Sequence, residues 1–194
     1  MFAGAACTDL TVEPRSTVTG ANVFSDVASY ESFLAKVYGG LVVTGQQGPA
    51  GQGDISGIDE GFSQYIRLLW QLQELPTDET VLAWGDGPIQ ELNTWQWSPN
   101  NQFMVSTYYR VYFSVNMANE FLRESTADKL RSRGQEDLIP IVEGYRAEAR
   151  FLRALSYWHG LDLFHDIPLV TEEDVLGSTP TQVQSDELYQ YIVD

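Results

Sequence analysis

The chain has 194 residues, of which 43% are hydrophobic and 12% aromatic, and its 11 basic and 27 acidic side chains give a formal net charge of −16. This length suits one domain of ordinary size or part of a larger protein, and the apolar share is large enough for a buried core, which argues against a disordered chain. The acidic surplus argues against binding to nucleic acid or to an anionic membrane surface.

The charge is unevenly distributed along the chain. The balance is −9 over residues 1–109, +1 over residues 110–153 and −8 over residues 154–194. No segment has the basic surplus that phosphate backbones require, whereas a neutral ligand, a cation or a basic partner is compatible with these charges.

The only cysteine, Cys7, directly follows Ala3-Gly4-Ala5-Ala6. One cysteine excludes an internal disulfide framework and a cysteine-based zinc site. Small residues before a cysteine resemble the end of a bacterial lipoprotein signal, after whose cleavage the cysteine is lipidated. Residues 1–25 are therefore interpreted as a signal remnant and extended lead-in, with Cys7 either the lipid anchor or an incidental thiol.

A first helix is predicted over Val27–Val43, because apolar residues recur there on one helical face. Residues 44–61 contain six glycines, which predict a loop. Asp54, Asp59 and Glu60 could offer oxygen ligands to calcium, but their spacing matches no EF-hand, so a solvated acidic loop is the favoured interpretation.

A second helix is predicted over Phe62–Leu75, where Pro76 ends it. Residues 76–104 then form a long segment without clear periodicity that contains Trp84, Trp95 and Trp97. A segment of this length in a compact domain indicates either a functional loop or short helices that the pattern does not reveal.

Further helices are predicted over Val105–Glu124 and Glu136–Phe164. The longer of the two has two apolar stripes, of which one contains Ala147, Phe151, Ala154, Trp158 and Leu161, and the other Tyr145, Ala149, Leu152 and Leu155. A helix that is apolar on two faces packs against neighbours on both sides, as in a stack of helix pairs.

Residues 165–181 are predicted to be an irregular connection before a last helix over Asp186–Asp194. That helix reaches the end of the chain without a residue that closes a helix. We therefore expect a helical domain over residues 26–194 that is the N-terminal portion of a longer protein.

The segment from Glu143 to Glu173 reads EGYRAEARFLRALSYWHGLDLFHDIPLVTEE. The run Ala147–Ala154, the pair Tyr157-Trp158, the pair Leu163-Phe164 and the Pro168 that follows resemble the signature of the SusD/RagB family. Members of this family are surface glycan-binding lipoproteins of Bacteroidetes, and the resemblance covers nearly all of the chain.

The resemblance implies an all-α fold, a solenoid of tetratricopeptide-like helix pairs with long irregular loops. It further implies a protein on the outer face of the outer membrane, anchored through lipid on Cys7. There the protein would capture an oligosaccharide, or in some members a peptide, and pass it to a SusC-like TonB-dependent transporter. Neither catalysis nor a cofactor is implied.

Candidate ligand-binding residues lie in the long irregular segment. Trp95, Trp97, Asn100 and Asn101 combine aromatic faces, on which sugar rings stack, with amides that bind hydroxyl groups. Trp84 is a further candidate, beside a Gly-Asp-Gly turn. The alternative interpretation is that these tryptophans anchor a long loop by packing beneath it.

Five other polar residues are predicted to be structural. Arg146, Arg150 and Arg153 lie close to one turn apart and should form a polar seam that pairs with acids on an adjacent helix. His159 and His165 have no accompanying histidine, cysteine or clustered acid, so hydrogen-bonded structural roles are expected for both.

Two other classes of protein compete with the capture protein. A tetratricopeptide adaptor would hold a peptide in its groove. An all-α glycoside hydrolase would need two carboxylates at a set distance, and Asp78, Glu79 and Asp86 are the acids nearest to the tryptophans. Nothing in the sequence marks any of the three as a catalytic acid.

Overall fold

The computed structural model describes residues 23–45 and 53–194, and this part of the chain is all-α as predicted. Its elements are α2 (Val27–Gly39), α3 (Tyr65–Glu74), α4 (Gly87–Thr94), α5 (Gln102–Glu124), α6 (Ala127–Ser132), the 3₁₀ turn η1 (Glu136–Leu138), α7 (Ile139–Phe164) and α8 (Ser185–Val193). Within these two ranges there is no β-strand, and the only β-type pairings are single bridges, Gly45–Gly53 and Pro168–Gln182.

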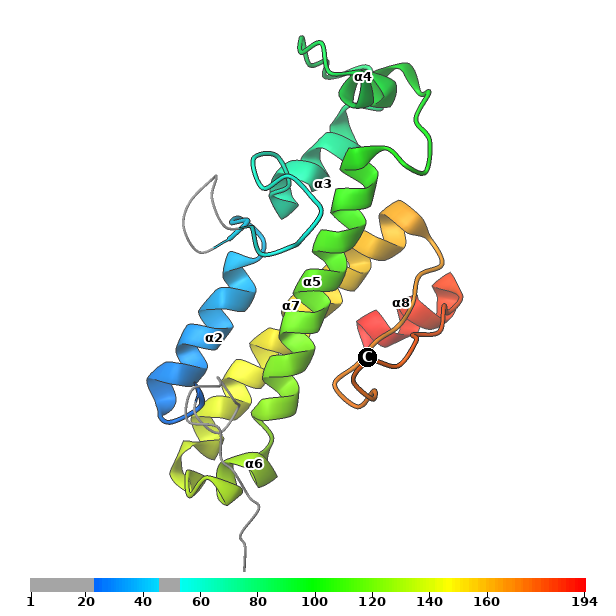
Figure 1. The fold of residues 1–194 in the computed structure, drawn as a ribbon. Coiled ribbons are helices and arrows are strands. Elements are labelled where there is room, and N and C mark those ends of the chain that lie inside the picture. Colours follow the sequence, from blue (N-terminus) through cyan, green and yellow to red (C-terminus); the bar gives the residue numbers. More distant parts are fainter. Residues whose placement is uncertain (1–22, 46–52) are drawn as a thin grey trace, which may run out of the picture.

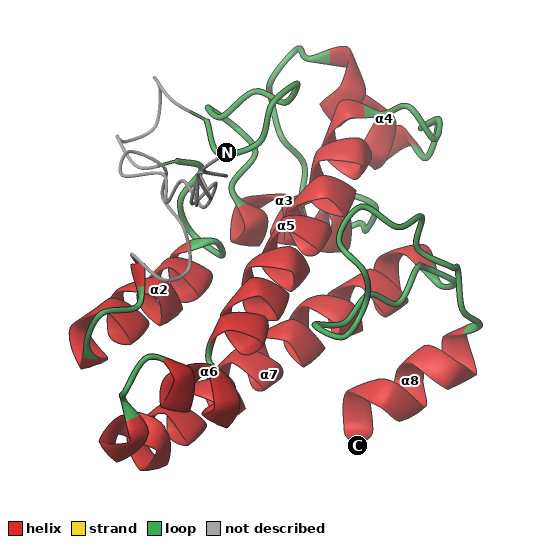
Figure 2. Ribbon diagram, turned by 60° about the horizontal axis from the view of Figure 1, so that its bottom comes forward, coloured by secondary structure: helices red, strands yellow, loops and turns green. Residues whose placement is uncertain are grey.

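The two longest helices, α5 and α7, lie antiparallel at the centre of the molecule (Figure 1). Helix α2 packs on both of them, α3 and α4 pack on α5, and α8 packs on α7. Figure 2 shows α2 and α8 on opposite sides of this central pair. Each long helix is therefore shared between neighbouring helix pairs, which is the arrangement of a helical solenoid.

Helix α2 begins at a capping box. Asp26 accepts a hydrogen bond from the Ser29 backbone N–H at 2.9 Å, and the Ser29 hydroxyl accepts one from the Asp26 backbone N–H at 3.2 Å. The helix ends at Gly39, whereas the sequence predicted it to continue to Val43. Two successive glycines favour the earlier end, because glycine has low helix propensity.

Helices α4 and α6 lie in segments to which the sequence analysis assigned no helix. Helix α4 spans only eight residues, begins with Pro88 in its first turn and buries only Ile89 and Leu92. Two apolar residues are too few to establish a helical period, which explains why the pattern did not reveal α4.

Only one of the two apolar faces of α7 is covered. Ala149 and Leu152 are buried, whereas Phe151 and Trp158 are 64% and 56% exposed. The expectation that both stripes pack is therefore wrong for the described residues, because the helices that pack on α7 contact its other sides. We call the residues Ala147, Phe151, Ala154 and Trp158 the outer stripe.

The connection between α7 and α8 is fastened to both central helices. On α5, Asn119 donates to the carbonyl of Val170 at 2.9 Å. On α7, the Tyr157 hydroxyl donates to the same carbonyl at 2.7 Å, and Arg153 forms an ion pair with Glu172. Burial raises the pKa of the Glu172 carboxyl, but the contact with Arg153 outweighs it, so the net pKa is lowered.

The predicted structural role of the arginine seam is correct for Arg146 and Arg153, but within the described residues none of the three arginines pairs with an acid on an adjacent helix. Arg153 pairs with an acid of the connection and not with one on an adjacent helix. Arg146 donates to the carbonyl of Leu122 at 2.5 Å, and its nearest acid is Glu143 of its own helix at 3.5 Å. Arg150 is exposed.

Arg110 ties α5 to the loop before α3. It is 1% exposed, and its Nε donates to the carbonyl of Ser63 at 2.6 Å. Its Nη1 lies 2.8 Å from Oδ1 of Asp54. A buried guanidinium needs such partners, so this contact fixes the start of α3 against the middle of α5.

We predict that Arg110→Met lowers the free energy of unfolding by about 3 kcal/mol or more, because it leaves the Ser63 carbonyl and the Asp54 carboxylate without their partner. The matched control is Arg131→Met, which removes a surface pair with Asp128. That change should cost about 0.5 kcal/mol or less. Urea denaturation measures both, and equal losses would contradict the buried role of Arg110.

Candidate functional site

Three tryptophans are exposed on the segment around α4, at one end of the molecule (Figure 1). Trp84, Trp95 and Trp97 are 51%, 71% and 40% exposed. Exposed aromatic side chains are candidates for an interaction surface, since burying them on a partner is strongly favourable. These exposed fractions argue against the alternative interpretation, in which the tryptophans pack beneath the loop.

Trp95 is held in an unusual backbone conformation. It ends α4 with φ 58° and ψ 35°, in the left-handed region, and the backbone N–H groups of Trp95 and Gln96 both donate to the carbonyl of Glu91. Glycine normally occupies this position of a helix end. A residue other than glycine, asparagine or aspartate there costs about 1–2 kcal/mol, which makes Trp95 a candidate for a functional side chain.

The Trp95 ring is also fixed from its edge. Its indole Nε1 donates to the carbonyl of Pro76 at 2.6 Å, which joins the end of α4 to the segment that follows α3. Because the polar edge of the ring is bound, its broad apolar face is the part left to solvent. A ring held in this way loses little side-chain entropy when a ligand stacks on it.

The backbone around Trp84 is fastened to α4 as well. The Gln90 side-chain amide donates to the carbonyls of Leu82 and Trp84 at 2.8 and 2.6 Å. The guanidinium carbon of Arg67 lies 5.6 Å from the centre of the Trp84 ring, within the range of a cation–π contact. The irregular segment is therefore positioned by specific contacts.

The two asparagines of the candidate site have different environments. Asn100 is exposed, and its side-chain amide makes no hydrogen bond within the described part of the chain. Asn101 is 3% exposed, accepts from the backbone N–H of Phe103 at 3.0 Å and donates to the carbonyl of Pro88 at 2.7 Å. The structure thus assigns Asn101 to capping α5 and to holding α4, in contrast to the predicted ligand contact.

The histidines and loop acids have partners within the chain. His159 lies 3.0 Å from the hydroxyl of Tyr65, and His165 lies 2.8 Å from Asp166. Asp54 pairs with Arg110, and Asp59 accepts from the backbone N–H of Gly61 at 2.6 Å. Residues 23–45 and 53–194 contain no group of three or more His, Cys, Asp or Glu side chains that could hold a metal ion.

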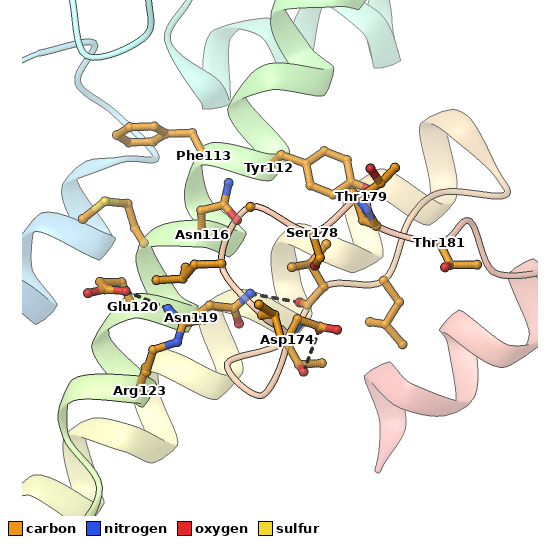
Figure 3. Close-up of a pocket in the computed structure, with 18 of the residues that line it drawn as sticks. Tyr112, Phe113, Asn116, Asn119, Glu120, Arg123, Asp174, Ser178, Thr179 and Thr181 are labelled. Atoms are coloured by element: carbon orange, nitrogen blue, oxygen red, sulfur yellow. Dashed lines mark hydrogen bonds and ion pairs between the residues drawn. The ribbon is translucent and has the colours of Figure 1, made fainter. Parts of the chain in front are cut away.

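A groove of about 860 Å³ lies between α5 and the connection that precedes α8. Figure 3 shows Asn116, Asn119 and Glu120 along α5, beside the loop that carries Ser178 and Thr179. Asn116 is exposed, whereas Asn119 is buried and engaged with the connection. Arg123 forms an ion pair with Glu120 at 2.7 Å, so these two opposite charges compensate each other.

The sequence pattern does not reveal this groove. Its two walls are about 50 residues apart in the chain, and they meet where Tyr112 and Asn119 bind the carbonyls of Pro168 and Val170. On α5, Asn119 binds a backbone carbonyl of the connection, whereas the side chain of Asn116 makes no hydrogen bond within the described residues.

Comparison with known proteins places these features in a family context. No family model matches the chain. Over 185 residues, 95% of its length, it is 35% identical to the starch-binding protein SusD of Bacteroides thetaiotaomicron. The chain thus resembles SusD in sequence. Its fold also resembles the crystal structure of a SusD-like carbohydrate-binding protein from Bacteroides fragilis, with a TM-score of 0.52 over 87% of the chain at 18% identity.

The predicted resemblance to the SusD/RagB family and the all-α fold are therefore confirmed. The SusD-like chain spans 31% of the length of the Bacteroides thetaiotaomicron protein and 30% of the length of the Bacteroides fragilis protein. Both relatives are named as binding proteins and neither as an enzyme. In the described residues of the chain, no helix is long and apolar enough to cross a membrane.

The backbone strain at Trp95 predicts an unusual order of stabilities. Trp95→Gly should be more stable than Trp95→Ala by about 1 kcal/mol, because only glycine accepts the left-handed conformation without cost. Trp97 has no positive φ, so there Trp97→Ala should be more stable than Trp97→Gly. The expected difference is about 0.5–1 kcal/mol, because glycine loses more backbone entropy on folding. Thermal and urea unfolding of the four variants measure both differences, and the same order at both positions would contradict the strain.

Proposed function

We propose that this SusD-like chain captures a glycan on the exposed tryptophans around α4. The observation that carries the proposal is the position of Trp95, whose ring is exposed, fixed at its indole edge and placed at a helix end where glycine would be less strained. Its similarity to a protein named for starch binding supports a carbohydrate ligand.

Sugar recognition needs apolar faces and amides, and this surface has both. Pyranose rings present C–H faces that stack on indole rings, and the free side-chain amide of Asn100 can bind hydroxyl groups as donor and acceptor. Trp97 and Trp84 extend the stacking surface on the same segment. The formal net charge of −16 favours a neutral glycan over an acidic one, because like charges repel.

The proposed cellular role follows from the family resemblance. The chain, or the protein to which it belongs, would be anchored to the outer face of the outer membrane through lipid on Cys7, which lies outside the described residues. It would pass the bound oligosaccharide to a SusC-like TonB-dependent transporter. In this proposal the helical body is the scaffold and the irregular segment carries the ligand.

We propose no catalysis. A glycoside hydrolase requires a carboxylic acid whose pKa is raised by its surroundings, usually through burial, beside a second carboxylate. Asp78, Glu79 and Asp86, the acids nearest to the tryptophans in sequence, are all exposed. Their exposure argues against a role as such a general acid, which is usually buried.

The groove along α5 favours one second candidate function, a peptide adaptor. It combines apolar side chains such as Phe113 and Met117 with the free amide of Asn116. An extended peptide could place an apolar side chain in such a groove and bind Asn116 with its backbone. The tryptophan surface lies elsewhere and would have no role in that function.

The proposal is tested by titrating the chain with neutral oligosaccharides, including malto-oligosaccharides. Tryptophan fluorescence reports the binding. We predict that Trp95→Ala and Trp97→Ala each weaken binding roughly threefold to tenfold, as expected for loss of one stacking contact. Trp158→Ala is the matched control, since Trp158 is a similarly exposed tryptophan on α7, and it should leave the affinity unchanged.

The same titration separates the three functions. Binding without release of reducing ends supports glycan capture, whereas release of reducing ends would establish a hydrolase. Absence of binding to every sugar, together with binding of a peptide that depends on Asn116, would establish the adaptor and overturn the proposal.

A further inference from the structure

The outer stripe of α7 is an apolar surface that the described residues leave uncovered. Phe151 and Trp158 expose 64% and 56% of their surfaces from the middle of a 26-residue helix. Exposed apolar side chains of this size, in line on one helix, mark a docking surface. Neither side chain belongs to the tryptophan surface around α4.

The spacing of the outer stripe fits a helical partner. Ala147, Phe151, Ala154 and Trp158 follow one another at intervals of four, three and four residues, the spacing of a coiled-coil seam. Large and small side chains alternate along it, so the alanines leave holes between the two aromatic knobs. At 1.5 Å per residue the seam is about 17 Å long, which matches roughly three turns of a second helix.

Polar contacts border one side of the seam, near both of its ends. Near one end, Glu148 accepts a hydrogen bond from the Tyr38 hydroxyl of α2 at 2.8 Å. Near the other end, Asp162 accepts one from the Gln73 amide of α3 at 2.6 Å. A narrow apolar strip with a polar border selects an amphipathic helix, because a wider apolar element would bury these polar groups.

We propose that the outer stripe receives an amphipathic helix from the part of a SusD-like protein that this chain does not span. The chain matches 31% of the starch-binding protein SusD, so about two thirds of that relative lie outside the region of likeness. Packing of the outer stripe against the rest of such a protein would explain why α7 has a second apolar face. The inference does not depend on glycan binding.

A full-length hybrid tests the proposal. In Bacteroides thetaiotaomicron SusD, the region that matches this chain over 185 residues is replaced by the matching residues of the chain. Phe151→Glu and Trp158→Glu should lower the melting temperature of the hybrid by several degrees, since they place charges in the seam. In the isolated chain the same changes should have little effect, because both side chains already face water.

Val81→Glu is the matched control, since Val81 is 67% exposed on a different surface, and it should change neither melting temperature. Equal shifts in the hybrid and the isolated chain would overturn the proposal. So would a dimer of the isolated chain, seen by sedimentation, that Phe151→Glu dissociates, because the occupant would then be a second copy.

If the hybrid does not fold, co-expression of the chain with the remaining part of SusD under an affinity tag makes the same comparison. Retention of the wild-type chain and loss of the Phe151→Glu, Trp158→Glu double variant would support the proposal. Retention of both, or of neither, would overturn it.

Discussion

The packing of α5 against α7 is the contact on which the rest of the structure depends. Ala118 of α5 and Ala149 of α7 are fully buried, so small side chains keep the two helices close. At Gly160 a Cβ atom would lie 2.6 Å from Cδ1 of Ile167 and 3.2 Å from Cγ1 of Val111 of α5. Helices α2, α3, α4 and α8 are each positioned by contact with one or both of these helices.

This helix pair is the scaffold that supports the candidate binding surface around α4. The connection after α7 is fastened through Asn119, Arg153 and Tyr157, and Arg110 fixes the loop before α3. The surface around α4 is then held by hydrogen bonds from side chains to backbone carbonyls, which leave its indole faces in water. Such a surface is positioned before a ligand arrives, which lowers the entropy that binding costs.

Much of the fold follows from the sequence, because long helices with a buried face leave a clear period. The segments from Val105 to Glu124 and from Glu136 to Phe164 were located to within a few residues. Helix α4 was not predicted because its two buried side chains are too few to show a helical period. The predicted first helix was longer than α2 because apolar residues continue past Gly39 and Gly40.

The site was harder to predict than the fold. Exposed and buried tryptophans look alike in a sequence, and the buried cap Asn101 cannot be told from its exposed neighbour Asn100. The groove along α5 depends on contacts between residues far apart in the chain. For the outer stripe, the periodicity of the sequence predicts an apolar helix face, but it does not predict which polypeptide covers that face.

The central claim, a helical scaffold that presents a glycan surface around α4, is tested most directly by amide hydrogen exchange with and without a bound neutral oligosaccharide. The account predicts that the ligand slows exchange between residues 76 and 101, while α5 and α7 exchange slowly in both states. Ligand protection confined to the groove of α5 and residues 169–183, with none around α4, would contradict it.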